Sequence, residues 1–210
     1  MKLKWHGHSC FEIGLDNGGV IITDPFDASV GYPLCTARAD VVLSSHDHFD
    51  HNYVDSLAGD FQVINTAGVH EVLGAKIVGV PTWHDDAQGA KRGANLIFVI
   101  EADGLRIAHL GDLGHLPETP EQIEALTGLD VMLIPIGGHF TIDTPQAVSI
   151  VERFSPRAAI GMHFHNKFCD FPVSDEKEFL RLTRGLLLPN SISITHSYPA
   201  GVYVMQAPGA

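Results

Sequence analysis

The residues best suited to chemistry lie together in segment 46–51, which reads His-Asp-His-Phe-Asp-His and directly follows a short apolar run. His46 and His48 can point to one side where the chain leaves an expected strand, and Asp50 with His51 can return to the same point on the next turn. Three imidazoles and a carboxylate suit divalent metals of borderline softness and leave coordination positions for water. The segment therefore predicts a metal site, with a polar surface loop of capping histidines as the alternative.

Four other segments place a histidine or an aspartate where an apolar run ends. They are Thr23-Asp24-Pro25-Phe26, Thr82-Trp83-His84-Asp85-Asp86, His109-Leu110-Gly111-Asp112 and Ile160-Gly161-Met162-His163. A layered α/β fold gathers its functional residues at strand ends. We therefore expect these four segments to meet the 46–51 segment at one site.

In residue types and in order, the five segments resemble the five motifs of the metallo-β-lactamase superfamily, and the resemblance covers nearly the whole chain. It implies a mixed α/β (α+β) fold, the four-layer αββα sandwich. It also implies two divalent metal ions; zinc and manganese are the expected metals and iron is a third option, because His and Asp ligands accept all three. Within the superfamily, Trp5-His6-Gly7-His8-Ser9 resembles the branch that includes ascorbate-6-phosphate lactonase-like proteins.

The resemblance further implies a ligand set for the two ions, with Asp112 bridging them. The expected ligands of the first ion are His46, His48 and His84. Those of the second ion are Asp50, His51 and His163. Asp24 and His109 would support the ligand histidines from behind without touching a metal.

Two metals about 3.5–4 Å apart lower the pKa of a shared water to near neutrality, and the hydroxide formed can attack a carbonyl or phosphoryl centre. The expected reaction is therefore hydrolysis of a small ester, lactone or phosphoester. Asp50, Asp112 and His139 are the expected catalytic residues.

Three residues are candidates for binding the substrate. Arg92 lies in a Gly-rich connection after His84 and could bind a carboxylate or phosphate, although a charged loop residue is usually solvated. His139 follows two glycines and is favoured for substrate contact over metal binding. His8 is expected either to line the pocket or to be a strand-end histidine satisfied by the backbone.

The last metal ligand is open between two histidines. His163 and His165 are two residues apart, so they would share one face of an extended strand. His163 is preferred because it directly ends the apolar run. His70 is expected in a short helix over 69–73, outside the site, and His196 on a late strand as a structural residue.

The elements that must position these residues follow from periodicity and turn signals. Strands are expected over residues 2–5, 11–15, 20–23, 41–44, 61–65, 76–80, 95–101, 105–110, 131–135, 158–162, 193–195 and 202–205. Helices are expected over 119–126, 144–154 and 174–182, the first two opened by Thr-Pro pairs. Asp103-Gly104 predicts a hairpin.

Composition limits the remaining functions. The 210 residues, 45% of them hydrophobic, are enough for one domain over 1–210. A net charge of −12 disfavours nucleic-acid partners, and no apolar run is long enough to span a membrane. Three scattered cysteines and a polar N-terminus favour a cytoplasmic protein. We expect a small, anionic substrate and allow a homo-oligomer.

Two other functions are compatible with the same residues. One is a non-catalytic metal-binding or regulatory protein that kept the site. The other is a mononuclear iron oxygenase of thiols on the same fold.

Overall fold

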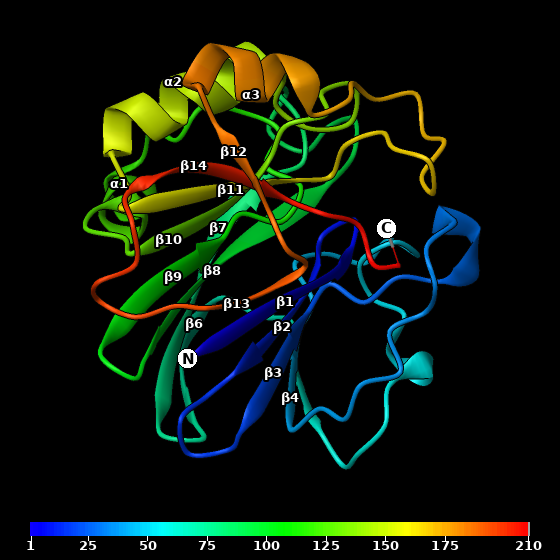
Figure 1. Cartoon of the computed structure of the whole chain (residues 1–210), viewed down its shortest axis with the longest axis vertical. Helices are drawn as coiled ribbons and strands as arrows, with labels where there is room; N and C mark the ends of the chain where they lie inside the picture. The colour runs from blue at the N-terminus through cyan, green and yellow to red at the C-terminus, as the bar shows by residue number, and fades with distance from the viewer. Residues whose placement is uncertain (210) are drawn as a thin grey trace.

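Most of the regular structure lies in two β-sheets that pack face to face in the computed structural model, which describes residues 1–209 (Figure 1). The six strands of the first sheet are, in spatial order, β13 (Ser191–Ser193), β1 (Lys2–Gly7), β2 (Cys10–Gly14), β3 (Val20–Thr23), β4 (Val41–Leu43) and β5 (Gln62–Ile64). The eight strands of the second are β12 (Leu186–Leu188), β14 (Gly201–Met205), β11 (Ala158–Met162), β10 (Val131–Pro135), β9 (Leu105–His109), β8 (Ala94–Ala102), β7 (Ala75–Trp83) and β6 (Gly68–Val72).

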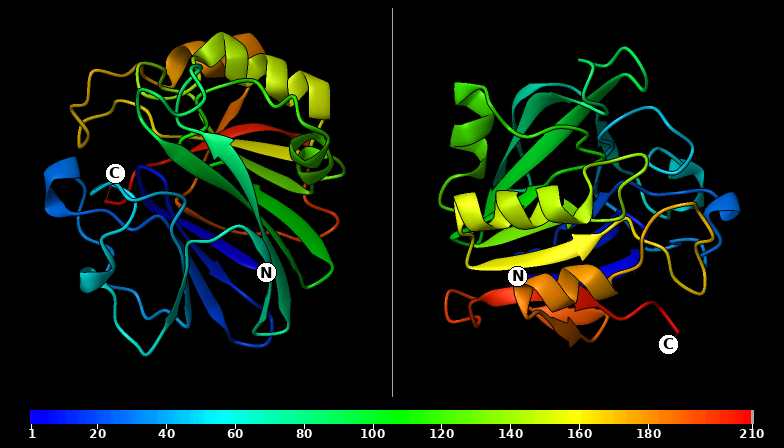
Figure 2. Two further views of the ribbon diagram at one scale, coloured as in Figure 1. Left: turned by 180° about the vertical axis from the view of Figure 1, so that it is seen from behind. Right: turned by 90° about the horizontal axis from the view of Figure 1, so that it is seen from above.

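The helices all lie on the outer side of the eight-stranded sheet (Figures 1 and 2). They are α1 (Pro120–Leu126), α2 (Thr144–Phe154) and α3 (Lys177–Thr183). Loops with two 3₁₀ turns, η1 (Ala28–Val30) and η2 (Val54–Ser56), lie on the side of the molecule away from these helices. The predicted mixed α/β fold with two packed sheets is confirmed, but in residues 1–209 the α-helices cover the second sheet alone, and the other helical segments are the short 3₁₀ turns η1 and η2.

The residues that predicted the helix starts and the hairpin make the contacts expected of them. The Thr119 side chain accepts a hydrogen bond from the backbone N–H of Gln122, whose own side chain accepts one from the Thr119 N–H, and this capping box starts α1. Asp143 and Gln146 cap α2 in the same way. Asp103 and Gly104 have φ values of 53° and 74°, as a tight hairpin between β8 and β9 requires.

The prediction of a helix over residues 69–73 is wrong, because Gly68–Val72 forms the edge strand β6. It pairs antiparallel with β7 through a turn at Leu73 and Gly74, whose φ values of 56° and 72° suit a two-residue hairpin. A five-residue segment cannot support a helix alone, and the turn fixes the strand pairing. His70 therefore lies on an edge strand away from the metal ligands.

Other elements are shifted or were not predicted. The third helix begins at Lys177 rather than at 174, because the backbone of Ser174 is held extended by hydrogen bonds to His165 and Gly137. The strand expected over 193–195 is β13, two residues earlier, which leaves His196 in an exposed turn. Strand β12 was not predicted, because three leucines at an exposed edge show no alternation.

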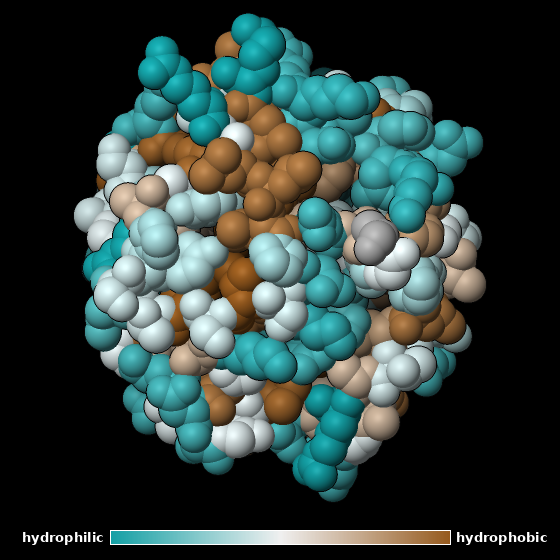
Figure 3. Space-filling view, in the orientation of Figure 1, coloured by the Kyte–Doolittle hydropathy of each residue, from teal (hydrophilic) through white to brown (hydrophobic). Residues whose placement is uncertain are grey.

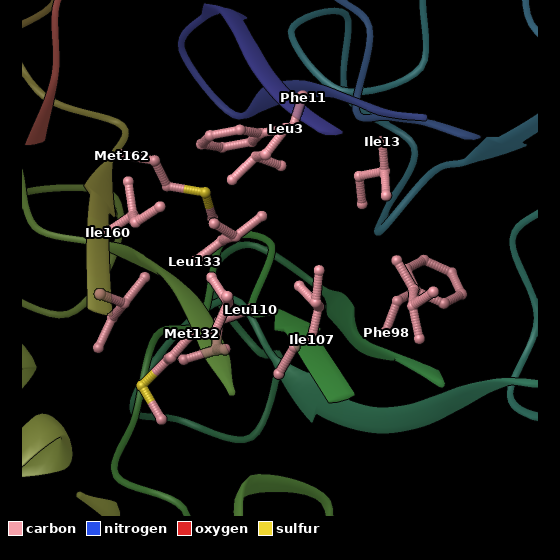
Figure 4. Packing of buried hydrophobic residues seen from close by; sticks show 14 of the residues in the cluster. Leu3, Phe11, Ile13, Phe98, Ile107, Leu110, Met132, Leu133, Ile160 and Met162 are labelled. Carbon is pink, nitrogen blue, oxygen red and sulfur yellow. The ribbon is translucent and has the colours of Figure 1, made fainter. Parts of the chain in front are cut away.

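The core lies between the sheets. Figure 4 shows Leu3, Phe11 and Ile13 of the first sheet facing residues of the second, which include Phe98, Ile107, Leu133 and Ile160. These side chains are almost fully buried. Their packing holds the two sheets in register with each other, and thus fixes the strand ends that carry the candidate residues.

The surface has one further apolar region. Figure 3 shows hydrophobic residues gathered over β12 and β14, where Leu186 and Leu187 are largely exposed. Among residues 1–209 no helix has the length and apolar character needed to cross a membrane.

Gly7, at the end of β1, should be intolerant of a side chain. Its φ of +116° is unfavourable for other residues, and an added Cβ would clash with the ring of Tyr32. Gly18 has a φ of +89° and open space around it, so a substitution there measures only the cost of placing a side chain on this backbone conformation. We expect Gly7→Ala to lower the free energy of unfolding by about 1–3 kcal/mol more than Gly18→Ala does, measured by urea denaturation. Equal effects of the two substitutions would show that the Tyr32 contact does not constrain this turn.

Candidate metal centre

The predicted ligands come together at one edge of the sandwich, where β4, β7, β9 and β11 end. Potential ligand atoms lie within 4.8 Å of one another in each of three sets. The sets are His46, His48 and His84; His46, His51 and Asp112; and His8, Asp50, His51 and His163. Every predicted ligand is included, and His8 is an additional member.

Asp112 connects the three sets. One carboxylate oxygen lies 3.2 Å from Nε2 of both His84 and His163, and the other lies 3.2 Å from Nε2 of His51. The backbone N–H of Asp112 donates to the side-chain oxygen of Asn95 at 2.9 Å, which fixes the turn after β9. A buried carboxylate that faces three imidazoles can contribute to a metal site together with them.

Asp24 orients His51 from behind. The Nδ1–H of His51 donates to Asp24 at 2.7 Å, so its Nε2 faces Asp112 and Asp50 and is the nitrogen that would give up its proton to bind a metal. Asp24 also accepts hydrogen bonds from the backbone N–H and the hydroxyl of Ser45, at 2.8 and 2.7 Å. This carboxylate–histidine pair is the usual support of a metal-binding imidazole.

Ser45 sets the tautomer of His46 through the same network. Its hydroxyl proton goes to Asp24, so at 2.9 Å the Ser45 oxygen must accept from Nδ1–H of His46. Nε2 of His46 is therefore an acceptor without a proton. Ser45 was not singled out in the sequence, although a hydroxyl residue next to a ligand histidine is a signal for this role.

The unsatisfied polar atoms of the site are those a metal would need. Among the described residues, buried atoms without a hydrogen-bond partner include Nε2 of His46, His51 and His163 and one carboxylate oxygen of Asp112. A buried polar atom without a hydrogen-bond partner destabilises the folded protein unless a ligand binds to it. Their mixture of imidazole and carboxylate donors fits zinc, manganese or iron. The residues thus fit the implied metals.

The electrostatics favour the neutral imidazole at two of the predicted ligands. Burial, aided by the nearby His51, lowers the pKa of His46 to about 3, and burial also lowers the pKa of His84. His51 is different: burial opposes its charge, but Asp112, Asp50 and Asp24 outweigh burial and hold its pKa well above the usual value. Despite their burial, Asp50 and Asp112 have lowered pKa values because histidines surround them. The site therefore offers lone pairs and carboxylate charge together.

His109 supports the backbone of the site. Its Nε2–H donates to the carbonyl of Ser9 at 2.8 Å, and its Nδ1 accepts the N–H of Gly111 at 3.2 Å. Both nitrogens are thus used, which agrees with the lowering of its pKa by burial. His109 links the first sheet to the turn that carries Asp112 and is not itself a ligand.

The structure brings His163, and not His165, to the metal ligands. His163 has a φ of 53°, which turns its ring out of the strand direction toward Asp112. His165 instead is half-buried, and its backbone N–H donates to the carbonyl of Ser174. The two side chains do not share a face because the chain leaves the extended conformation at His163.

His8 is buried beside Asp50, His51 and His163, and this position does not support a substrate-binding role for it. It is only 1% exposed, and its Nε2 lies 3.1 Å from Asp50. A φ of 51° and the glycine before it turn the ring inward, while its carbonyl accepts from the indole N–H of Trp5. Burial, with His163 nearby, lowers the pKa of His8 to about 4, so the neutral ring donates its Nε2–H to Asp50.

Arg92 reaches the site, whereas His139 does not. Asp85 accepts hydrogen bonds from four backbone N–H groups of the loop 87–92, including Arg92 at 2.7 Å, and so shapes this loop. Arg92 lines a cavity of about 360 Å³ together with the ligands His48 and Asp112. His139 is exposed and lines a neighbouring cavity; only its carbonyl contacts Arg92, at 2.9 Å, so the predicted catalytic role of its imidazole is not supported by its position.

Comparison with known proteins places the chain among enzymes of related fold. The model of the Beta-lactamase superfamily domain matches residues 2–163, more than half of the chain. The chain belongs to this superfamily. A solved structure from Thermotoga maritima, described as a zinc-dependent hydrolase of the metallo-β-lactamase superfamily, is 35% identical, covers 98% of each chain and has a TM-score of 0.82.

Relatives in sequence agree with this assignment. A UPF0173 metal-dependent hydrolase of Thermococcus onnurineus is 32% identical over 87% of this chain and 92% of its own length. One from Staphylothermus marinus is 31% identical over 94% and 99%. The prediction of a metal-dependent hydrolase with the metallo-β-lactamase fold is confirmed at this level. None of these relatives is described as an ascorbate-6-phosphate lactonase, so that narrower resemblance stays a prediction.

Removal of the His8 side chain should weaken metal binding through Asp50. Partners that orient metal ligands typically contribute 10- to 100-fold in metal affinity, and we expect about this loss for His8→Ala. His8→Gln has the same backbone strain but keeps a donor near Asp50, so it should retain more of the affinity. The measurement is competition titration with a chromophoric chelator; equal affinities of wild type and His8→Ala would contradict the role.

The metal-free protein should lose stability as the pH falls from about 6.5 toward 4.5. The pKa values of His8 and His46 are lowered from 6.5 to about 4 and about 3 in the folded protein, so in this range only the unfolded chain takes up their protons. His51, whose pKa is raised, stays protonated in the folded protein across this range, so it adds only a small opposite effect as the unfolded chain completes its protonation. Urea denaturation after chelation, at pH 6.5 and 4.5, measures the effect. Greater stability at pH 4.5 would refute the assignment of neutral buried histidines.

Proposed function

We propose that this metal-dependent hydrolase of the metallo-β-lactamase superfamily holds two divalent ions and cleaves a small, anionic ester, lactone or phosphoester. The observation that carries the proposal is the position of Asp112: one of its oxygens faces both His84, an expected ligand of one ion, and His163, an expected ligand of the other, while the second oxygen faces His51. When bound, the ions would supply a hydroxide at neutral pH and positive charge for the developing oxyanion. Zinc and manganese are the preferred ions.

The protein residues have separate tasks in this proposal. His46, His48 and His84 would hold one ion, and Asp50, His51 and His163 the other. Asp50 lines the cavity with its carboxylate kept ionised by the surrounding imidazoles, so it can accept a proton from attacking water and return it to a leaving group. His8 holds the second oxygen of that carboxylate in place.

The charge distribution supports a small anion as the substrate. Arg92 adds a cation at the wall of the cavity, while the chain as a whole carries a net charge of −12. A carboxylate or phosphate would be attracted locally, but a long polyanion would be repelled by the remaining surface. We therefore propose that the protein has neither nucleic-acid nor membrane partners. We also propose that it is cytoplasmic and acts as a single chain or as a homo-oligomer.

Substitution of Asp112 tests the proposal. Zinc- or manganese-loaded protein is assayed against lactones, carboxylic esters, thioesters, phosphomonoesters and phosphodiesters, with metal content measured in parallel. We expect turnover of at least one class, and a loss of about 100-fold or more in kcat/KM for Asp112→Asn together with loss of bound metal. Asp86→Asn is the matched control, because that carboxylate is 74% exposed and pairs with Lys91 away from the metal ligands.

Three outcomes would contradict the proposal. Two retained ions with full activity in Asp112→Asn would show that this carboxylate is not a bridge. Full metal loading without turnover of any class would favour the non-catalytic protein. A single iron per chain with consumption of oxygen and a thiol would favour the oxygenase.

A further inference from the structure

The cavity beside the metal ligands has an aromatic wall. Phe49, Phe140 and Phe171 line it, together with Arg92 and ligands of both candidate ions. The Phe171 ring lies edge-on to the other two, with centroid distances of 6.4 Å to Phe49 and 6.2 Å to Phe140. The three phenylalanines come from three different loops, those after β4, β10 and β11.

Core packing accounts for part of the Phe171 contacts but does not explain the position of Phe49. Phe49 is 52% exposed although it stands between two ligand residues of the 46–51 segment. Burial of a phenylalanine stabilises a protein by roughly 1.5–3 kcal/mol, and this side chain forgoes much of that gain. A wall of one exposed and two half-buried aromatic rings next to reactive groups is typical of a ligand pocket.

Arg92 defines the other end of the same cavity. Its guanidinium lies 5.6 Å from the centre of the Phe140 ring and donates to the carbonyl of His139 at 2.9 Å. The loop that carries it is fixed by Asp85, so the charge is held in place before any ligand binds. A guanidinium above a ring can bind an anionic group while the ring contacts an adjacent apolar group.

We propose that the substrate carries a planar apolar group, of the size of a phenyl ring, next to the bond that is cleaved, and that Phe49 and Phe171 select it. The anionic group of the same molecule binds Arg92. This inference rests on the proposed function, because it places the reacting bond at the metal ligands. It names the substrate class as aryl-substituted anionic esters, lactones or phosphoesters rather than short aliphatic ones.

Binding of two non-hydrolysable probes tests the selection without turnover. Phenylphosphonate and methylphosphonate carry the same anionic group, and calorimetry with zinc-loaded protein gives both dissociation constants. We expect phenylphosphonate to bind about 10- to 100-fold more tightly, as burial of one ring predicts. In Phe49→Ala and Phe171→Ala this preference should fall below about 3-fold, with methylphosphonate affinity unchanged.

Two further variants make the test specific. Leu187→Ala removes a side chain with a similar exposure of 56% that lines a different cavity, so it should keep the full preference. Arg92→Gln should weaken both probes by the same factor. Equal affinity of the two probes for wild type, or binding of neither, overturns the aromatic selection. Hydrolysis in the ester panel is measured separately, so failure of this inference is distinguished from failure of the proposed function.

Discussion

The carboxylate of Asp112, buried and 3.2 Å from each of three imidazoles, is the constraint on which the site depends. A buried charge needs compensation, and here it faces Nε2 of His51 and of His163, which have no hydrogen-bond partner. Protonation of His51 provides part of the compensation in the metal-free chain. Two divalent ions would satisfy the carboxylate and the unpaired nitrogens together, which explains why so many ionisable groups are tolerated in one place.

Both sheets are needed to build this arrangement. Asn95 of the second sheet holds the turn of Asp112, while Ser9 of the first sheet accepts from His109 beside that turn. Several functional residues also adopt left-handed backbone conformations, with φ values of 51° at His8, 40° at Asp24 and 53° at His163. Such conformations cost on the order of 1–3 kcal/mol each and persist only when the surrounding structure enforces them. The large core between the sheets provides that enforcement.

The sequence predicted the parts of the site that depend on local order. The 46–51 segment, Asp24, His84 and Asp112 each end an apolar run, and parallel strands bring such ends to one edge. Turn chemistry and caps likewise located α1, α2 and the β8–β9 hairpin. These features are encoded within a few residues, so no knowledge of tertiary contacts was needed.

The remaining features depend on contacts between distant segments. His8 was a candidate pocket residue, but a positive φ turns it toward Asp50, directly after Gly7, where the Tyr32 ring leaves no room for a side chain. His139 follows two glycines near the site, yet its ring points into another cavity. The choice of His163 over His165 and the pairing of β6 with β7 were likewise decided by backbone geometry that periodicity does not contain. The aromatic wall combines three loops and had no signal in any one of them.

The central claim is that one carboxylate joins two ions at this edge of the sandwich. Anomalous difference maps from a crystal of zinc-loaded protein, recorded on both sides of the zinc absorption edge, test it directly. The account predicts two peaks per chain, one next to His46, His48 and His84, the other next to Asp50, His51 and His163, with Asp112 in contact with both. A single peak, or two peaks of which only one contacts Asp112, would contradict it.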